Sequence, residues 1–195
     1  MTPTIIIHAL TPDRWGDLAA LFDTNAVTRG CWCMWFRTTS AEFHAGRNAR
    51  NKRAFKRIVT KSEVPPGLLA YVDGEPAGWC ALAPRDDYPR IARARAMKPI
   101  DDKPAWAITC FFVRRSARGR GVTRALLKDA VAFARAHGAT LIEGYPVDTS
   151  SGRVTADAAY HGTLKLFTDA GFTEVTRRDS RRAIVRKRVR PQLRT

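Results

Sequence analysis

Hydrophobic and polar residues follow two different spacings along this chain of 195 residues. Short runs of apolar residues, rich in β-branched side chains, predict strands. Elsewhere apolar residues recur every three or four positions, which is typical of helices with one buried face. The expected strands cover 4–10, 105–113 and 140–148, with one or two more within 173–189. A hairpin is expected over 67–87, with its turn at Asp73 and Gly74. The expected helices cover 11–25, 39–61, 122–138 and 155–172.

Strands and helices therefore alternate along one chain, and the pattern contains no internal repeat. This order predicts a single mixed α/β domain over 1–190, followed by a basic tail over 191–195. The proline-punctuated stretch 84–104 is the longest expected loop, and long loops in small domains are usually functional or mobile. A capping box of Thr39 and Glu42 marks the start of the second helix.

The formal net charge is +16, and the basic residues are clustered in two segments. Residues 47–61 hold seven basic residues and no acidic ones, and 177–195 hold nine against Asp179 alone. Such clusters suit a polyanion partner, and they also arise from an arginine-rich composition without any partner. A basic nucleic-acid-binding protein without catalytic activity is therefore one alternative, although no DNA-reading motif accompanies these segments and we do not expect nucleic acid as a partner.

The sequence carries no signal for export or for a membrane. No segment approaches the roughly 20 apolar residues of a membrane span. The first ten residues lack the basic region and long apolar run of a signal peptide. We therefore expect a cytoplasmic protein without a membrane partner, in which the four cysteines are free thiols: Cys31, Cys33, Cys80 and Cys110.

The stretch "CFFVRRSARGRGVTRALL", 110–127, carries the clearest chemistry. An apolar strand enters a turn rich in arginine and glycine, and a helix begins directly after it. The backbone N–H groups of a first helical turn lack partners within the helix, and the helix dipole is positive there. Such a turn binds phosphate or pyrophosphate. The spacing matches neither a P-loop nor a dinucleotide-binding fingerprint.

The same residues resemble motif A of the GNAT acetyltransferase superfamily. Arg118 takes the position of an Arg or Gln, Gly121 that of the glycine, and Thr123 stands where Gly or Ala is usual. The order of elements before and after the motif also matches, so the resemblance covers roughly residues 4 to 189. It implies a GNAT fold, in which a mixed central sheet splays at the cofactor site and helices flank the sheet. The segment "GCWCMWFR" is similar to one in small bacterial members.

The resemblance implies an N-acetyltransferase that uses acetyl-CoA as co-substrate. The backbone amides from Arg118 to Thr123 would hold the pyrophosphate. The strand 111–113 would pair with the pantetheine and point one N–H at the thioester carbonyl. The acceptor would be a primary amine of a small molecule, an antibiotic or a peptide, which attacks the thioester directly. A homodimer fits the habits of the superfamily. The implied cofactor residues are Phe111, Phe112, Val113, Arg118, Gly119, Arg120, Gly121, Val122 and Thr123.

The catalytic groups do not follow from the resemblance. The family often places an acidic tyrosine four residues before the glycine that ends the last helix, and here that position is Phe167. We instead expect Tyr145 to act as the acid and Glu143 as the base. The two residues are two apart in a strand, so they share one face of it. His161 is a further candidate for acid–base work, and Asp148 is a weaker one.

The segment "GCWCMWFR", 30–37, allows several interpretations. Two cysteines without a second pair are too few for a structural zinc site, so we expect no metal. Nothing in the sequence activates a redox thiol pair, and core packing alone is an alternative. The resemblance places the segment between the first two helices, where this superfamily builds acceptor pockets. The expected substrate-binding residues are Cys31, Trp32, Cys33, Met34, Trp35 and Arg37, with Glu42 and the acidic residues of 84–104 as the nearest negative charges.

Overall fold

Seven strands form one mixed sheet in the computed structural model, which describes residues 3–150, 152, 154–155 and 159–192. The order across the sheet is β1-β2-β3-β4-β5-β7-β6, and only the β4–β5 pair is parallel. The strands are β1 (Ile5–Ala9), β2 (Gly67–Val72), β3 (Glu75–Pro84), β4 (Trp106–Val113), β5 (Leu141–Gly144), β6 (Thr173–Asp179) and β7 (Arg182–Arg188). The expected mixed α/β fold and the hairpin that turns between β2 and β3 are confirmed.

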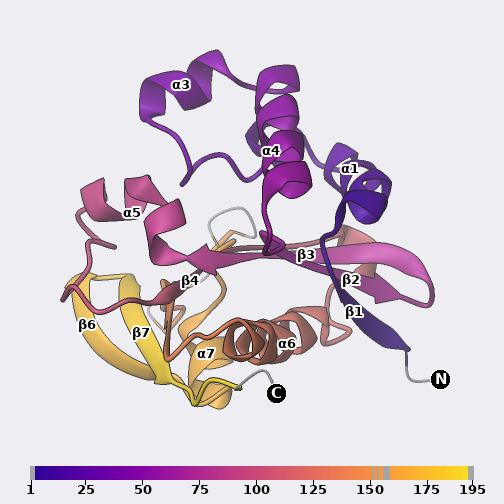
Figure 1. Ribbon diagram of the computed structural model, residues 1–195. Coiled ribbons are helices and arrows are strands. Elements are labelled where there is room, and N and C mark those ends of the chain that lie inside the picture. Colours follow the sequence, from indigo (N-terminus) through magenta and orange to yellow (C-terminus); the bar gives the residue numbers. More distant parts are fainter. Residues whose placement is uncertain (1–2, 151, 153, 156–158, 193–195) are drawn as a thin grey trace.

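Helices cover both faces of this sheet (Figure 1). One face carries the helices that precede β2, and the other carries α6 and α7. The helices are α1 (Trp15–Asp23), α2 (Ala26–Cys31), α3 (Ser40–Ala45), α4 (Ala49–Lys61), α5 (Pro89–Arg93), α6 (Val122–Ala136) and α7 (Leu164–Asp169), with 3-10 turns η1 (Pro12–Arg14), η2 (Arg85–Asp87) and η3 (Arg115–Ala117). No helix of the described residues is long and apolar enough to cross a membrane.

Each face of the sheet has its own apolar core. Under α6, side chains such as Leu126 and Leu127 pack on Ile108 and Ile142 of the two central strands. On the opposite face, Trp32 packs with residues of α1, α4 and β3. A third, smaller cluster joins Phe36, Tyr88, Tyr145 and Ile184 beside α5. Burial of these large side chains fixes how the helices lie on the sheet, because each contributes about 1.5–3 kcal/mol when it leaves water.

The parallel pair β4–β5 stays together for only three residue pairs, of which the last joins Ile108 to Gly144. Beyond this point β4 continues to Val113 along β3, whereas the chain after β5 diverges. Val147 instead forms single bridges with Thr163 and Arg182. The sheet therefore opens between its two central strands, as the resemblance implied.

Two expected helices are wrong in extent. The helix expected over 39–61 is interrupted between α3 and α4, where Asn48 has a φ of 62°. The side-chain amide of Asn51 donates to the carbonyl oxygens of Gly30 and Phe43, which stabilises the break by tying α2, α3 and α4 together. The capping box of Thr39 and Glu42 at the start of α3 is confirmed.

Of the helix expected over 155–172, the described residues form a helix only over α7. The Thr163 hydroxyl accepts from the N–H of Leu166 and caps this helix at its start. Gly162, just before the cap, has a φ of 80°, which a helix cannot contain. Residues 156–158 of the expected helix lie outside the described residues. The expected loop over 84–104 also differs, because it contains η2 and α5.

Candidate active site

Two cavities meet beside the opened sheet, and we name each by what lines it. The strand cavity, of about 680 Å³, runs along 109–113 of β4 under the segment 22–36. The arginine cavity, of about 650 Å³, lies between the segment 35–42, α5 and residues 160–161. Trp35, Phe36 and Tyr160 line both cavities, so they form the partition between them. Both volumes suit small-molecule ligands.

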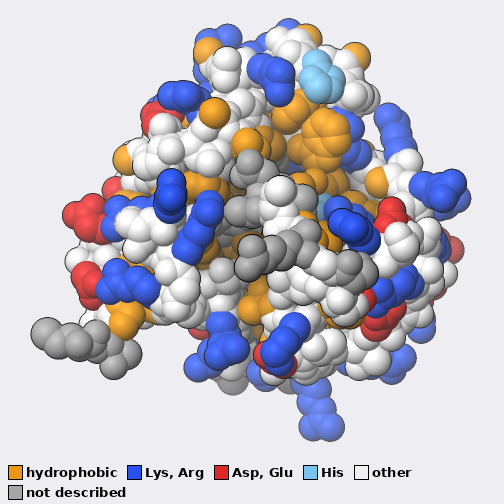
Figure 2. Space-filling view, turned by 180° about the vertical axis from the view of Figure 1, so that it is seen from behind, with side chains coloured by type: hydrophobic (Ala, Val, Ile, Leu, Met, Phe, Trp, Pro, Cys, Tyr) orange, Lys and Arg blue, Asp and Glu red, His pale blue; other side chains and the backbone are white. Residues whose placement is uncertain are grey.

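The strand cavity is largely apolar, and among the described residues that line it only Arg47 and Arg118 are charged. Figure 2 shows apolar side chains gathered in a hollow on this side of the molecule, with Lys and Arg around its rim. Five of the implied cofactor residues line it: Phe111, Phe112, Val113, Arg118 and Thr123. The cavity thus joins the open edge of β4 to the turn that precedes α6.

That turn leaves several backbone donors unpaired. The N–H groups from Gly119 to Thr123 have no acceptor among the described residues, and no side chain caps α6. Gly121 has a φ of 84° at the start of α6, a conformation that favours glycine. Arg118 donates from Nε to the carbonyl of Val113 at 3.2 Å. The turn therefore presents free N–H groups and the positive end of a 15-residue helix.

The other implied cofactor residues contribute less directly. Arg120 forms an ion pair with Asp73 at 2.7 Å, so its charge is already matched. The side chain of Val122 is buried in the core under α6, which leaves only its backbone for a ligand. The N–H of Phe111, in the strand expected to point one N–H at the thioester, donates to the carbonyl of Tyr160 at 2.6 Å. Because N–H groups alternate along a strand, that of Val113 faces the same open edge.

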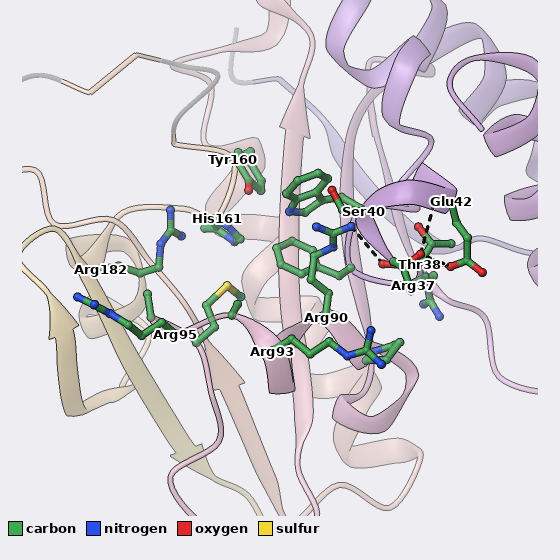
Figure 3. A pocket seen from close by; sticks show the side chains of 17 residues that line it. Arg37, Thr38, Ser40, Glu42, Arg90, Arg93, Arg95, Tyr160, His161 and Arg182 are labelled. Carbon is green, nitrogen blue, oxygen red and sulfur yellow. Dashed lines mark hydrogen bonds between the residues drawn. The ribbon is translucent and has the colours of Figure 1, made fainter. Parts of the chain in front are cut away.

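The arginine cavity carries an excess of positive charge. Five arginines and one glutamate line it: Arg37, Arg90, Arg93, Arg95, Arg182 and Glu42. Figure 3 shows Arg95 and Arg182 on one side of the cavity, Arg90 at its centre and Glu42 on the far side. The guanidinium of Arg90 stacks on the ring of Trp35 at 3.8 Å and donates to the carbonyl of Thr38. Trp35 therefore supports a charged group here as well as forming the partition.

His161 faces the arginine cavity and is only 1% exposed. Its Nδ1 is buried and has no hydrogen-bond partner among the residues that the structure describes. Burial, together with the nearby charge of Arg182, lowers the pKa of His161 well below its usual value, so the ring is neutral at pH 7. The ring of Tyr160 lies 4.0 Å from that of His161, and burial raises the pKa of Tyr160 to about 12. A neutral imidazole and a phenol therefore lie together at the partition.

Glu143 and Tyr145 lie close to each other, but they line neither cavity. The Tyr145 hydroxyl donates to Glu143 Oε2 at 2.9 Å. Oε1 of Glu143 accepts from Arg85 at 3.1 Å and from Arg186 at 2.8 Å. Both side chains are buried, and burial followed by the charge of Glu143 raises the pKa of Tyr145. These partners indicate a structural ion-pair network. Asp148 is likewise engaged, in an ion pair with Arg177 at 2.6 Å.

Some residues of the segment 30–37 are buried in the core, and others line the two cavities. Trp32 and Cys33 have φ of 48° and 53°, and these consecutive left-handed residues turn neighbouring side chains in different directions. Trp32 packs among Trp15 and Phe22, and Met34 is also buried, so neither lines a cavity. The remaining expected substrate residues do line one: Cys31, Cys33 and Trp35 the strand cavity, and Trp35 and Arg37 the arginine cavity.

Sequence reasoning missed most of the arginine cavity. The arginines of "PRIARARAM", 89–97, lie in the stretch expected to face an acceptor, but their number was visible only as overall charge. Two acidic residues near the cavity are already paired, since Asp101 pairs with Arg186, and Asp87 with the lining residue Arg37. No group of three or more potential metal ligands occurs in the described part of the chain.

Comparisons with known proteins agree with this geometry. The structure resembles a PaiA N-acetyltransferase from Thermoplasma acidophilum solved in complex with coenzyme A, with a TM-score of 0.56, 13% identity, and coverage of 95% of this chain and 99% of that chain. It also resembles a GNAT-family acetyltransferase from Listeria monocytogenes, with a TM-score of 0.57, 12% identity and 95% coverage of both chains. For a histone acetyltransferase HPA2 and related acetyltransferase from Corynebacterium glutamicum, the TM-score is 0.52 at 20% identity, with coverage of 100% and 99%.

At these identities the structural likeness shows the fold alone. No curated protein sequence matches the chain significantly. The model of the acetyltransferase (GNAT) family, however, matches residues 32–160, which is more than half of the sequence. This match favours an acyltransferase over a nucleic-acid-binding protein without activity. The matched segment contains the turn before α6, the open edge of β4 and the partition between the two cavities, and the chain belongs to the acetyltransferase (GNAT) family.

Proposed function

We propose that this chain transfers an acetyl group from acetyl-CoA, the donor in this family, to a primary amine. The strand cavity would hold the donor and the arginine cavity the amine. The observation that carries this proposal is the meeting of the two cavities at Trp35, Phe36 and Tyr160, where a thioester and an amine from opposite sides could approach each other.

The donor site follows from the charges of the strand cavity. The free N–H groups of the turn before α6, with Arg118 and Arg47 nearby, suit the pyrophosphate. The apolar lining along Phe112 and Cys110 suits the uncharged pantetheine chain. The backbone N–H groups on the open edge of β4 would polarise the thioester carbonyl and stabilise the oxyanion that forms upon attack.

The acid and base of the reaction would come from the partition. The neutral amine attacks the thioester carbonyl, its nitrogen forms the amide bond, and the carbon–sulfur bond breaks. The unpartnered Nδ1 of His161 would take the proton that the amine loses. The hydroxyl of Tyr160 would donate a proton to the departing thiolate. Glu143 and Tyr145, sealed among arginines, are left out of this scheme.

The test compares two glycines at opposite ends of α6. Gly121 and Gly138 both have a φ of 84° and both have room for a side chain, so a substitution strains each backbone equally. Gly121→Glu places a carboxylate at the expected pyrophosphate site and should weaken acetyl-CoA binding by at least about tenfold in calorimetry. Gly138→Glu carries the same strain and should bind as the wild type does. Equal binding by both variants would contradict this donor site.

A second measurement tests the transfer itself. Amine libraries are incubated with acetyl-CoA, and the free thiol is read out. For any acceptor found, His161→Gln and Tyr160→Phe should each lower kcat by about 10²–10⁴-fold, the usual contribution of general acid–base groups. Unchanged kcat in both variants would remove these residues from the mechanism, and a complete lack of thiol release would contradict the transferase activity.

A further inference from the structure

Most of the positive charge of the arginine cavity is not matched by a carboxylate of the described residues. Within the described residues, Arg90, Arg93, Arg95 and Arg182 form no ion pair with any carboxylate. Glu42, the one acidic residue among the described residues that line the cavity, accepts from the N–H and the hydroxyl of Thr39 in the capping box. Its charge is therefore already used to stabilise the start of α3.

Carboxylates pair with Arg186 close by and with Arg37, the fifth arginine that lines the cavity, so the excess is specific to the other four. Arg186 pairs with both Asp101 and Glu143, and Arg37 lies 3.6 Å from Asp87. Acidic residues are thus available in this region, and they are placed on arginines that hold the fold together. The four arginines of the cavity are left for a ligand or for solvent.

Two of these arginines are held in place by other contacts. Arg90 is fixed by its stacking on Trp35 at 3.8 Å and by the Thr38 carbonyl, and its Nε is buried without a partner in the described part of the chain. Arg182 approaches from β7 and donates to the carbonyl of Tyr145 at 3.1 Å. Buried donors without a partner are rare in folded proteins, so we expect the Nε of Arg90 to bind a ligand. Arginines with fixed planes suit the paired oxygens of a carboxylate or phosphate.

The second unpartnered group in the cavity fixes the direction of the ligand. Within the described residues, Nδ1 of His161 is buried without a hydrogen-bond partner, and the ring lies beside Tyr160 at the partition and close to the charge of Arg182. In Figure 3, His161 and Tyr160 lie between Arg182 on one side and Arg90 on the other, and Arg95 and Arg93 lie further from His161. A short ligand whose amine faces His161 and whose anionic group faces the neighbouring guanidinium groups would satisfy both kinds of group.

We propose that the acceptor is a small anionic amine, whose carboxylate or phosphate is bound by Arg90, Arg95 and Arg182 while its amine faces His161. This rests on the proposed function, because it assigns the amine to the arginine cavity. The volume of about 650 Å³ limits the acceptor to the size of a metabolite or a short peptide end. A polycation such as a polyamine is disfavoured, since five arginines would repel it.

The first experiment tests the anion site without any turnover. Inorganic phosphate and acetate are titrated into the free protein in the Gly121→Glu background, which blocks the turn before α6. We expect saturable binding of at least one anion, weakened at least about tenfold by Arg182→Ala and by Arg95→Ala. Arg188→Ala, on the exposed end of β7, is the matched control and should change nothing. Absence of saturable binding, or equal binding by all variants, would overturn the proposal.

The second experiment compares acceptors that differ only in the anionic group. O-phosphoethanolamine is paired with ethanolamine, and glycine with glycinamide, while spermidine serves as the cation. We expect the anionic member of at least one pair to be acetylated with a kcat/KM about tenfold or more above its neutral partner, mainly through KM. The pair that responds distinguishes phosphate from carboxylate. A preference for spermidine or for the neutral members would overturn the proposal.

The two experiments also separate this proposal from the proposed function. If acetyl-CoA neither binds nor releases thiol, the transferase assignment fails, whereas the anion titration still decides the arginine site. If acetyl-CoA is used but anions do not bind, only the assignment of an anionic acceptor fails. Arg95 is exposed and has no protein partner among the described residues, so Arg95→Glu should fold normally and reverse the preference between charged and neutral amines.

Discussion

The N–H of Phe111 donates to the carbonyl of Tyr160 at 2.6 Å, directly beyond the point where β4 and β5 separate. The same segment is tied to the chain after β5, because the N–H of Val147 donates to the carbonyl of Gly162 at 2.9 Å. Residues 160–162 thus occupy the opened edge of β4 that a pantetheine chain would use. Donor binding at this edge would break the hydrogen bond between the Phe111 N–H and the Tyr160 carbonyl.

This relationship predicts a change in amide exchange upon donor binding. Coenzyme A should increase the hydrogen exchange of the Val147 and Gly162 amides, because Val147 donates to the Gly162 carbonyl and Gly162 donates to the Ala159 carbonyl, and displacement of Gly162 would break both bonds. Amides in the centre of β2, such as Leu69, should be unaffected. The measurement is hydrogen exchange with and without coenzyme A. Unchanged exchange at both sites would mean that the N–H of Val113 serves without any displacement.

The network around Glu143 predicts a loss of stability without a loss of activity. Tyr145→Phe removes the hydroxyl that donates to the buried carboxylate at 2.9 Å. Loss of a hydrogen bond to a charged group should lower the free energy of unfolding by about 1.5–3 kcal/mol. Because Tyr145 lines neither cavity, kcat should stay within about threefold of the wild type.

Tyr160→Phe is the matched control for this prediction. It removes a hydroxyl at the partition, and no hydrogen bond of that hydroxyl is present in the described structure. In urea unfolding, Tyr145→Phe should therefore lose stability and Tyr160→Phe should not. In initial rates, Tyr160→Phe should lose activity and Tyr145→Phe should not. A large drop in kcat for Tyr145→Phe with unchanged stability would restore Tyr145 as the catalytic acid.

The sequence predicted well what depends on contiguous residues. The hairpin, the strand 105–113 and the turn before α6 are encoded by neighbouring side chains, so their elements and the free N–H groups followed directly. The spacing of Glu143 and Tyr145 also placed them correctly on one face. Whether this shared face is buried depends on Tyr88 and Ile184, which are distant in the sequence and pack with Tyr145. The spacing alone could not show this burial.

The arginine cavity illustrates the opposite case. It brings together 35–42, 89–97, 160–161 and Arg182, which are separated by up to 147 positions. No local pattern connects these segments. The sequence showed their charge, but only the tertiary structure distinguishes Arg182, which faces the cavity, from Arg186 on the same strand, which pairs with Asp101.

Cys33 is predicted to be the most reactive of the four thiols. Its sulfur accepts from Nε1 of Trp79 at 3.0 Å. A hydrogen bond from the Cys110 thiol, together with Trp79 and the charge of Arg37, lowers the pKa of Cys33, whereas burial raises the pKa of Cys80. Iodoacetamide should therefore alkylate Cys33 first, because the thiolate is the reacting form. Mass spectrometry of the labelled peptides measures the order.

Two comparisons check this prediction. Acetyl-CoA should slow the alkylation, because Cys33 lines the strand cavity. Trp79→Phe keeps an aromatic ring but removes the N–H donor. The variant should react more slowly, because loss of this hydrogen bond raises the pKa of Cys33 and lowers the fraction of thiolate. Faster labelling of Cys80 or Cys31 than of Cys33 would contradict the expected order.

His161 predicts how stability depends on pH. Burial holds the pKa of His161 in the folded protein well below 6.5, so below pH 6.5 the unfolded chain takes up a proton that the folded chain does not. Stability is therefore unaffected by this group above pH 7 and falls as the pH drops below 6.5, by at most about 1.4 kcal/mol per pH unit. His161→Gln should remove this dependence, whereas His44→Gln on the surface should keep it. Urea unfolding between pH 5 and 8 provides the measurement, and a parallel loss of stability in the wild type and in His161→Gln would show that the buried imidazole does not control it.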